Sequence, residues 1–176
     1  MQDRQAEAIL QALIELSPKA MQMPPDYEGR ANFMWAATNA LNNLIHMGVP
    51  QDWSTHAIGH ELTAFYGLSH AESLAVVLPY LLWYKREQKA EKLIQYGKRV
   101  WDVRANGDRE RIFKTIETTA AFFNNLGMPT ALSAYGVDPD EAAERVCARF
   151  TERNTVLGEH EDITPEDVAN ILRMSR

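Results

Sequence analysis

The chain has 176 residues, of which 45% are hydrophobic, and a single cysteine, Cys147. A chain of this length and composition can fold around a sizeable core, and one cysteine excludes an internal disulfide. The net charge of −6 argues against nucleic acid or an anionic membrane surface as the partner.

Neither a membrane span nor a targeting signal stands out. The longest apolar run, residues 74–84, is interrupted by Pro79 and is shorter than the roughly 20 residues that cross a bilayer. The first ten residues lack the charged start and apolar block of a signal peptide. We therefore expect this apolar run to be a buried helix and the protein to be cytoplasmic.

Helical periodicity begins at the start of the chain. Residues 3–16 place five apolar side chains on one face, and prolines from position 18 onward predict a break after them. The face consists of Ala6, Ile9, Leu10, Leu13 and Ile14. A long helix is predicted from about Tyr27 to Met47, ahead of Gly48 and Pro50. Four methionines in this region are expected to fill the core. They are Met21, Met23, Met34 and Met47.

Turn residues mark the next two helices. One is predicted from near Asp52 to Gly67, with the glycine as its C-cap. Ser69 and Glu72 have the spacing of a capping box, so the following helix should begin at His70. It should kink at Pro79 and end near residue 86, and the charged run at 85–92 is expected to be a solvated face.

Four further helices complete the predicted fold. Residues 90–103 are amphipathic, and a turn at 106–108 precedes a helix that should stop near residue 127. Asp138 and Thr164 each precede a proline, which suits the first turn of a helix. No period-2 strand and no repeat is present. The sequence predicts an all-α fold, a single domain of seven to eight helices.

Three of the five histidines lie close together, at positions 56, 60 and 70. His56 and His60 are one helical turn apart, about 6 Å along the axis, and Gly59 between them should leave room for a ligand. If the helix that begins at His70 folds back, that side chain can meet His56. Neutral imidazoles bind iron(II), zinc and similar ions. The pattern is also compatible with histidines that pack in a helical core, and the HExxH motif of zinc proteases is absent.

The stretch around these histidines resembles the C-terminal helical half of the iron-containing (group III) alcohol dehydrogenases. The likeness is strongest to the NADPH-dependent aldehyde reductase and butanol dehydrogenase branch, and it extends over nearly the whole chain. Its most specific part is H-x3-H, nine residues, a third H, and then an apolar stretch ending in "LP", which runs from His56 to Pro79. The resemblance implies the C-terminal α domain found in dehydroquinate synthase-like proteins.

The resemblance also implies roles for individual residues. His56 and His70 would be ligands of a catalytic Fe²⁺ or Zn²⁺, while His60 would lie near the substrate for proton transfer instead of chelating with His56. Trp53 and Phe65 are candidates for the apolar wall of a substrate site. The reaction implied is the interconversion of small primary alcohols and aldehydes with NAD(P).

Parts of the family's pattern are missing from this chain. The other two ligands belong to a D-x3-H motif, whereas the only histidine before residue 50 is His46, with Asn42 four residues earlier. No Gly-rich turn of a dinucleotide site and no GxSxG nucleophile motif is present. We therefore expect a fragment: the metal and substrate domain without its N-terminal α/β domain, inactive alone, weak in metal binding, and homo-oligomeric.

Two alternatives remain open at this stage. The chain could be a standalone helical metalloprotein, for example a hydrolase that uses Glu61 or Glu159 as a further ligand. It could instead be a non-catalytic interaction module whose exposed apolar domain surface forms a dimer.

Overall fold

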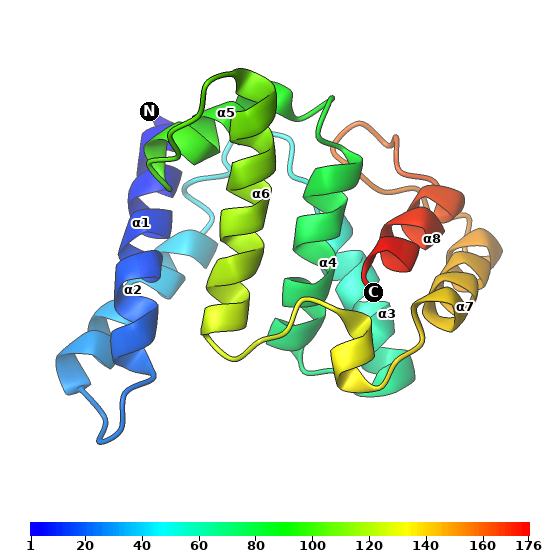
Figure 1. Ribbon diagram of the computed structural model, residues 1–176, viewed down its shortest axis with the longest axis horizontal. Coiled ribbons are helices and arrows are strands. Elements are labelled where there is room, and N and C mark those ends of the chain that lie inside the picture. The colour runs from blue at the N-terminus through cyan, green and yellow to red at the C-terminus, as the bar shows by residue number, and fades with distance from the viewer. The chain divides into compact units, whose positions relative to one another are not determined.

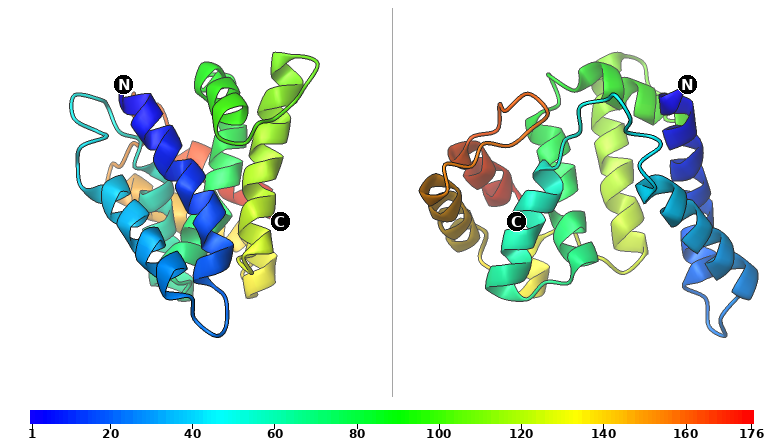
Figure 2. Two further views of the ribbon diagram at one scale, coloured as in Figure 1. Left: turned by 90° about the vertical axis from the view of Figure 1, so that its left-hand side faces the viewer. Right: turned by 180° about the vertical axis from the view of Figure 1, so that it is seen from behind.

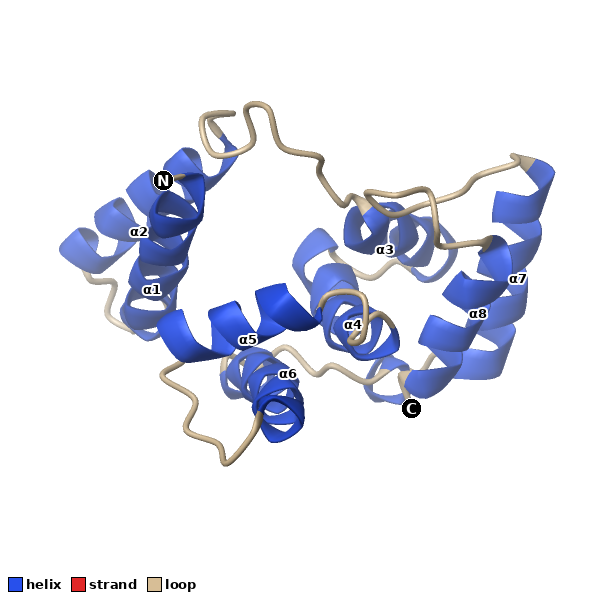
Figure 3. Ribbon diagram, turned by 90° about the horizontal axis from the view of Figure 1, so that it is seen from above, coloured by secondary structure: helices blue, strands red, loops and turns tan.

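The computed structural model describes all 176 residues and contains only helices, turns and loops (Figures 1 and 3). An isolated antiparallel bridge between Leu157 and Ile163 is the nearest approach to a strand. The prediction of an all-α fold is confirmed. The eight α-helices and one 3-10 helix are α1 (Gln2–Ala20), α2 (Tyr27–Leu41), α3 (Ser54–Tyr66), α4 (His70–Tyr84), α5 (Ala90–Arg99), α6 (Asp108–Asn125), η1 (Leu132–Tyr135), α7 (Pro139–Glu152) and α8 (Pro165–Met174).

The helices form two compact units. The first unit comprises residues 1–50 and 91–115, and the second comprises residues 51–90 and 116–176. No helix is both long enough and apolar enough to cross a membrane.

In the first unit, α1 and α2 pack side by side and are joined by the loop at 21–26, as Figure 2 shows. Helix α5 is tied to α1 by polar contacts around Glu7, whose carboxylate accepts hydrogen bonds from Gln95 at 2.6 Å and from Arg99 at 3.0 Å. A second contact joins Lys92 to Asp3 at 2.7 Å. Polar side chains therefore supply much of the contact between these two helices.

The second unit holds the main hydrophobic core. It is built from α3, α4, α7 and α8, and α7 and α8 lie against each other (Figure 3). Each of the larger side chains contributes roughly 1.5–3 kcal/mol by leaving water. The fully buried members from these helices include Ile58, Leu62, Val76, Val77, Val146, Val168 and Ile171.

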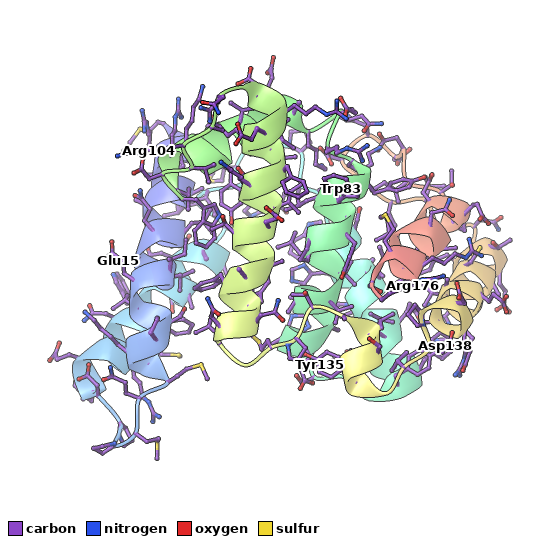
Figure 4. The ribbon with its side chains drawn as sticks, in the orientation of Figure 1. Glu15, Trp83, Arg104, Tyr135, Asp138 and Arg176 are labelled. Atoms are coloured by element: carbon purple, nitrogen blue, oxygen red, sulfur yellow. The ribbon has the colours of Figure 1, made fainter.

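Most helix ends in the second unit follow the predicted caps. Gly67 adopts the left-handed conformation at φ 73° and ends α3. Asp138, labelled at the start of α7 in Figure 4, accepts hydrogen bonds from the backbone of Asp140 and Glu141. Thr164 forms a capping box with Asp167 at the start of α8. These termini are set by residues within four positions in the chain.

Several predictions for the first fifty residues are wrong. Helix α1 continues through Pro18, which occupies the last turn, where the helix ends two residues later. Helix α2 ends at Leu41 instead of near Met47, and Asn43 follows in a left-handed conformation. Leu10, predicted to face inward, is 39% exposed.

The four methionines predicted to fill the core are exposed, because no other helix covers them in this structure.

Lys85 and Lys89 in the charged run were predicted to be solvated, and this prediction is wrong as well. Lys85 is buried and donates to Asp162 at 2.6 Å, and Lys89 is half-buried. Ion pairs with acidic side chains offset the cost of removing these ammonium groups from water.

Candidate functional site

The three histidines of the second unit converge. His56 and His60 project from successive turns of α3, and His70 is the first residue of α4. The ring centres of His56 and His70 are 5.4 Å apart, those of His60 and His70 are 5.6 Å apart, and those of His56 and His60 are 6.2 Å apart. The expectation that α4 folds back and brings His70 to His56 is confirmed.

A close approach between α3 and α4 supports this convergence. A Cβ atom on Gly59 would lie 2.9 Å from Ser73 Oγ and 3.1 Å from Leu74 Cδ2, so a larger residue would collide with α4. The space at Gly59 is therefore used by α4 and not by a ligand, which corrects the role predicted for this glycine. The glycine allows the start of α4, with His70, to lie next to the histidines of α3.

Local hydrogen bonds fix the position of His70. The Ser69 hydroxyl accepts from the Glu72 backbone, and the Glu72 carboxylate accepts from the Ser69 backbone at 2.8 Å. Ser73 Oγ donates to the His70 carbonyl at 2.9 Å. The predicted capping box is thus confirmed, and it determines where the third imidazole begins.

The start of α3 is anchored from two sides. Asp52 accepts a hydrogen bond from the Ser54 backbone at 2.8 Å and forms an ion pair with Lys89 at 2.9 Å. Lys89 also donates to both carboxylate oxygens of Glu159, at 2.6 and 2.7 Å. One ammonium group therefore joins the turn after α4, the start of α3 and the loop before α8.

Trp53 lies at the edge of the histidine cluster. Its ring meets that of His56 edge-on, with centres 5.0 Å apart, and its indole N–H donates to Gln51 at 3.0 Å. The side chain is 51% exposed, so one part packs on the histidine while another part faces solvent. This position suits the predicted wall of a substrate site.

Phe65 lies elsewhere on α3. The guanidinium groups of Arg149 and Arg145 cover its ring at 4.0 and 4.3 Å from the ring centre. On a helix, Phe65 points roughly 140–180° away from His56 and His60. The structure therefore does not bring Phe65 together with the histidines.

Electrostatics favour a neutral imidazole at His56. Partial burial lowers the pKa of His56, and the charges that His70 and His60 carry when protonated lower that pKa further. The neutral form offers a free nitrogen lone pair, which is what a metal ion or a proton donor needs.

The two carboxylates suggested as further ligands are both engaged elsewhere. Glu61 accepts from Arg149 at 2.7 Å and from Arg153 at 2.8 Å, and Glu159 pairs with Lys89. No group of three His, Cys, Asp or Glu side chains is arranged to hold a metal ion. Neither Glu61 nor Glu159 is therefore free to complete a metal site at the histidine cluster.

The whole chain matches the profile of one protein family. The profile of the Fe-containing alcohol dehydrogenase family, C-terminal, matches residues 1–176. This chain belongs to that family.

Relatives within the family agree with this assignment. The NADPH-dependent aldehyde reductase YqhD of Escherichia coli is 50% identical over all of this chain and 46% of its own length. The NADH-dependent butanol dehydrogenase A of Clostridium acetobutylicum is 36% identical over 99% of this chain and 46% of its own length. A solved structure of the substrate- and cofactor-free Escherichia coli YqhD superposes with a TM-score of 0.95, covering 99% of this chain and 46% of that one. The chain thus spans about half the length of these family members.

Sequence reasoning missed the charged residues around the cluster. Lys89 lies in a run that looks like a solvated face, and nothing in its neighbourhood signals Asp52 as a partner. The arginines at 145, 149 and 153 do have a signal, because a four-residue spacing puts them on one stripe of α7. That spacing predicts a shared acidic or aromatic partner, although it does not identify Glu61.

Proposed function

We propose that this chain supplies the metal- and substrate-binding helical part of an iron-dependent alcohol dehydrogenase that interconverts primary alcohols and aldehydes with NAD(P). The convergence of His56, His60 and His70 carries this proposal, together with membership of the family. The Escherichia coli relative is named as an aldehyde reductase and the Clostridium acetobutylicum relative as a butanol dehydrogenase, which supports a small primary alcohol or aldehyde as substrate.

His56 and His70 are the residues that would hold the ion. Their rings are neighbours, and the lowered pKa of His56 keeps its nitrogen available, so the pair fits two ligand positions of Fe²⁺ or Zn²⁺. The remaining ligands would come from outside this chain, since both nearby carboxylates are occupied. When bound, the ion would supply Lewis-acid activation of the substrate oxygen.

The other residues would handle the proton and exclude water. In the oxidation direction, the alcohol loses a hydride to NAD(P)⁺ and a proton to His60, giving the aldehyde and NAD(P)H. His60 is exposed, so its imidazole can pass that proton to solvent. Trp53 would form an apolar wall beside the reacting carbon and limit the access of water.

A chimaera tests this proposal directly. The chain would replace the corresponding C-terminal part of Escherichia coli YqhD, and reduction of butyraldehyde by NADPH would be followed at 340 nm. We expect turnover in the chimaera and none from the 176-residue chain alone, since no dinucleotide-binding turn is present in it. His56→Ala and His70→Ala should abolish turnover and metal retention, whereas His160→Ala, on an exposed loop, should change neither. A folded chimaera that retains metal but has no activity would contradict the proposed reaction.

His60 is expected to behave differently from the two ligands. His60→Ala should retain metal while turnover falls by roughly 10²–10⁴-fold, the range typical of lost proton transfer. Equal loss of metal in all three histidine variants would contradict the separate roles.

Exposed apolar side chains in the first unit support a role in assembly as well. Met34 and Leu41 of α2 line a hollow of about 400 Å³ together with Ala37, Thr38 and Asn42. Apolar side chains this exposed usually pack against another surface, which supports a homo-oligomer or a further domain as partner. Sedimentation of the chain from 1 to 100 μM would show self-association, and a monomer throughout would count against the homo-oligomer.

We also propose that the enzyme is located in the cytoplasm.

A further inference from the structure

Arginines of α7 and its C-cap bind the side chain of Glu61 on one side of α3. Arg149 Nη1 donates to Glu61 Oε2 at 2.7 Å, and Arg153 Nη1 donates to Glu61 Oε1 at 2.8 Å. Glu61 is only 7% exposed, and each of its carboxylate oxygens has its own charged donor. These three residues are called the Glu61 clamp below.

The contact continues one turn further along α3. Arg149 and Arg145 stack on the ring of Phe65, and Arg145 also lies 5.1 Å from the ring centre of Tyr66. The Tyr66 hydroxyl donates to Glu141 on α7 at 3.4 Å. Charged and aromatic contacts therefore join α3 to α7 over about one and a half helical turns.

The Glu61 clamp lies beside the histidine face of α3. At about 100° per residue, Glu61 is one step around the helix from His60 on one side, and Gly59 is one step on the other. Gly59 packs on Ser73 of α4, so the face that carries His56 and His60 is flanked by α4 and by α7. Contacts on both flanks oppose rotation of α3 about its axis.

The chemistry of the Glu61 clamp suits this task better than an apolar contact would. Apolar side chains tolerate a small slide or roll, because dispersion and burial depend little on direction. Two charge-assisted hydrogen bonds below 2.9 Å to one carboxylate require a single register and a single orientation. Breaking one of them would leave one oxygen of a buried carboxylate without its charged donor, so other orientations of α3 are disfavoured.

We propose that Glu61, Arg149 and Arg153 are positioning residues that fix the rotation of α3 and hold the His56 and His60 rings toward His70. The Glu61 clamp touches neither substrate nor metal. Its link to catalysis rests on the function proposed above, whereas its effect on the histidine rings does not.

The test uses the 176-residue chain with two readouts. The first is the set of ring Cε1–H signals of the histidines by NMR without metal, and the second is the affinity for Co²⁺ alone. Arg153→Gln removes half of the Glu61 clamp from a position remote in sequence from the histidines, so a change in their signals reports an effect carried through Glu61 and α3. Arg153→Lys keeps the charge and should leave both readouts close to the wild type.

We expect Arg153→Gln to shift the His56 and His60 signals and to lower the Co²⁺ affinity about tenfold, as the loss of supporting contacts around metal ligands does. Glu61→Gln should act in the same direction and more strongly. The control is Ile171→Val, which removes one methyl group from the buried face of α8. It lowers stability but leaves the contacts of Glu61 with Arg149 and Arg153 in place. It should change neither readout.

The outcomes separate the two proposals. Unchanged histidine signals in folded Arg153→Gln would overturn the positioning role, whatever the metal does. An equal shift in Ile171→Val would overturn it too, because the signals would then follow stability alone. A wild-type chain that shows no Co²⁺ binding would agree with a site whose remaining ligands lie outside this chain, and the ring signals alone would then decide the role of the Glu61 clamp.

Discussion

Gly59 links a single residue to the geometry of the histidine cluster. Alanine loses less backbone entropy than glycine when the helix forms, which favours the variant by about 0.5–1 kcal/mol. Its methyl group would also lie 2.9 Å from Ser73 Oγ, and a serine that moved away would give up its hydrogen bond to the His70 carbonyl. The collision and the lost bond act together on the start of α4.

We predict that Gly59→Ala lowers the free energy of unfolding by about 1 kcal/mol net, because overpacking typically costs 1–3 kcal/mol. Urea denaturation measures this. Removing the Ser73 hydroxyl in the same chain should recover part of the loss, since Ser73 Cβ would then be 3.5 Å from the new methyl group. Gly107→Ala is the control, because no atom lies within 4 Å of its Cβ position. A double variant less stable than Gly59→Ala would contradict the collision.

Asp52 connects the histidine helix to a salt link that responds to pH. Burial raises the pKa of its carboxyl, but hydrogen bonds from Ser54 and the ion pair with Lys89 outweigh burial, and the pKa lies below its ordinary value of 3.8. A depressed pKa means that the folded state favours the carboxylate. The stability this supplies is present above pH 3.8 and is lost as pH falls through the lower folded value.

We therefore predict that Asp52→Asn costs roughly 2 kcal/mol at pH 7, the scale of a hydrogen-bonded charged group. The difference from the wild type should shrink as pH is lowered from 4 toward 2. Thermal unfolding across this range gives the measurement. Asp140→Asn, which removes an exposed ion pair to Arg176, should cost less than about 1 kcal/mol at pH 7. A constant penalty from pH 7 to pH 2 would rule out the linkage.

At the scale of helices, two capping boxes of the same kind allow a matched experiment. Ser69 on α4 and Thr164 on α8 each form a capping box, and only the first lies beside a histidine of the cluster. Loss of a cap costs about 1 kcal/mol in either place. The two variants should therefore match in stability and differ at the site.

We predict that Ser69→Ala and Thr164→Ala lower the unfolding free energy by similar amounts, about 1 kcal/mol each. Only Ser69→Ala should weaken Co²⁺ binding, because fraying of the first turn of α4 lets His70 move. Isothermal titration with Co²⁺ beside urea denaturation compares the two. Equal Co²⁺ affinities in both variants would show that the cap supports the helix without holding His70.

The helix ends also show what the sequence could reveal. Gly67, Ser69, Asp138 and Thr164 were predicted correctly, because a cap is formed by neighbours in the chain. The convergence of the histidines was predictable too, since a tight turn after Gly67 leaves α4 little choice but to return along α3. A glycine and a proline alone were less reliable markers, because α2 ends at Leu41, well before Gly48 and Pro50.

What the sequence did not reveal depended on distant partners. Met34 and Met47 have the pattern of core residues, yet a pattern cannot tell whether another helix will cover them. Lys85 looked solvated, and its burial follows from Asp162, which is 77 positions away. The Glu61 clamp was missed for the same reason, since Arg149 is 88 positions from Glu61.

At the scale of the whole chain, the two compact units differ in how much apolar surface they bury. Ala36 and Leu93 are the buried hydrophobic residues of the first unit, and its helices α1 and α5 are joined largely by polar contacts. All other buried hydrophobic residues belong to the second unit, where the candidate site is located. Buried apolar area is the main source of stability, so the second unit should be the more stable one.

Local opening follows local burial, and hydrogen exchange reports it. We predict that the backbone amides of α1 and α2 exchange at least about tenfold faster than those of α3, α4 and α8, which corresponds to a difference of about 1.4 kcal/mol in opening free energy. Mass spectrometry of peptides from each helix after exchange measures this difference.

A partner of the first unit should change this pattern. Because α2 exposes Met34, Trp35 and Leu41, a partner that covers this face should slow the exchange of α1 and α2. In the chimaera with the N-terminal half of YqhD, that protection would show that the exposed face of the first unit is completed by the rest of the enzyme. Equal exchange in both units of the isolated chain would mean that polar contacts around Glu7 stabilise the first unit as well as an apolar core does.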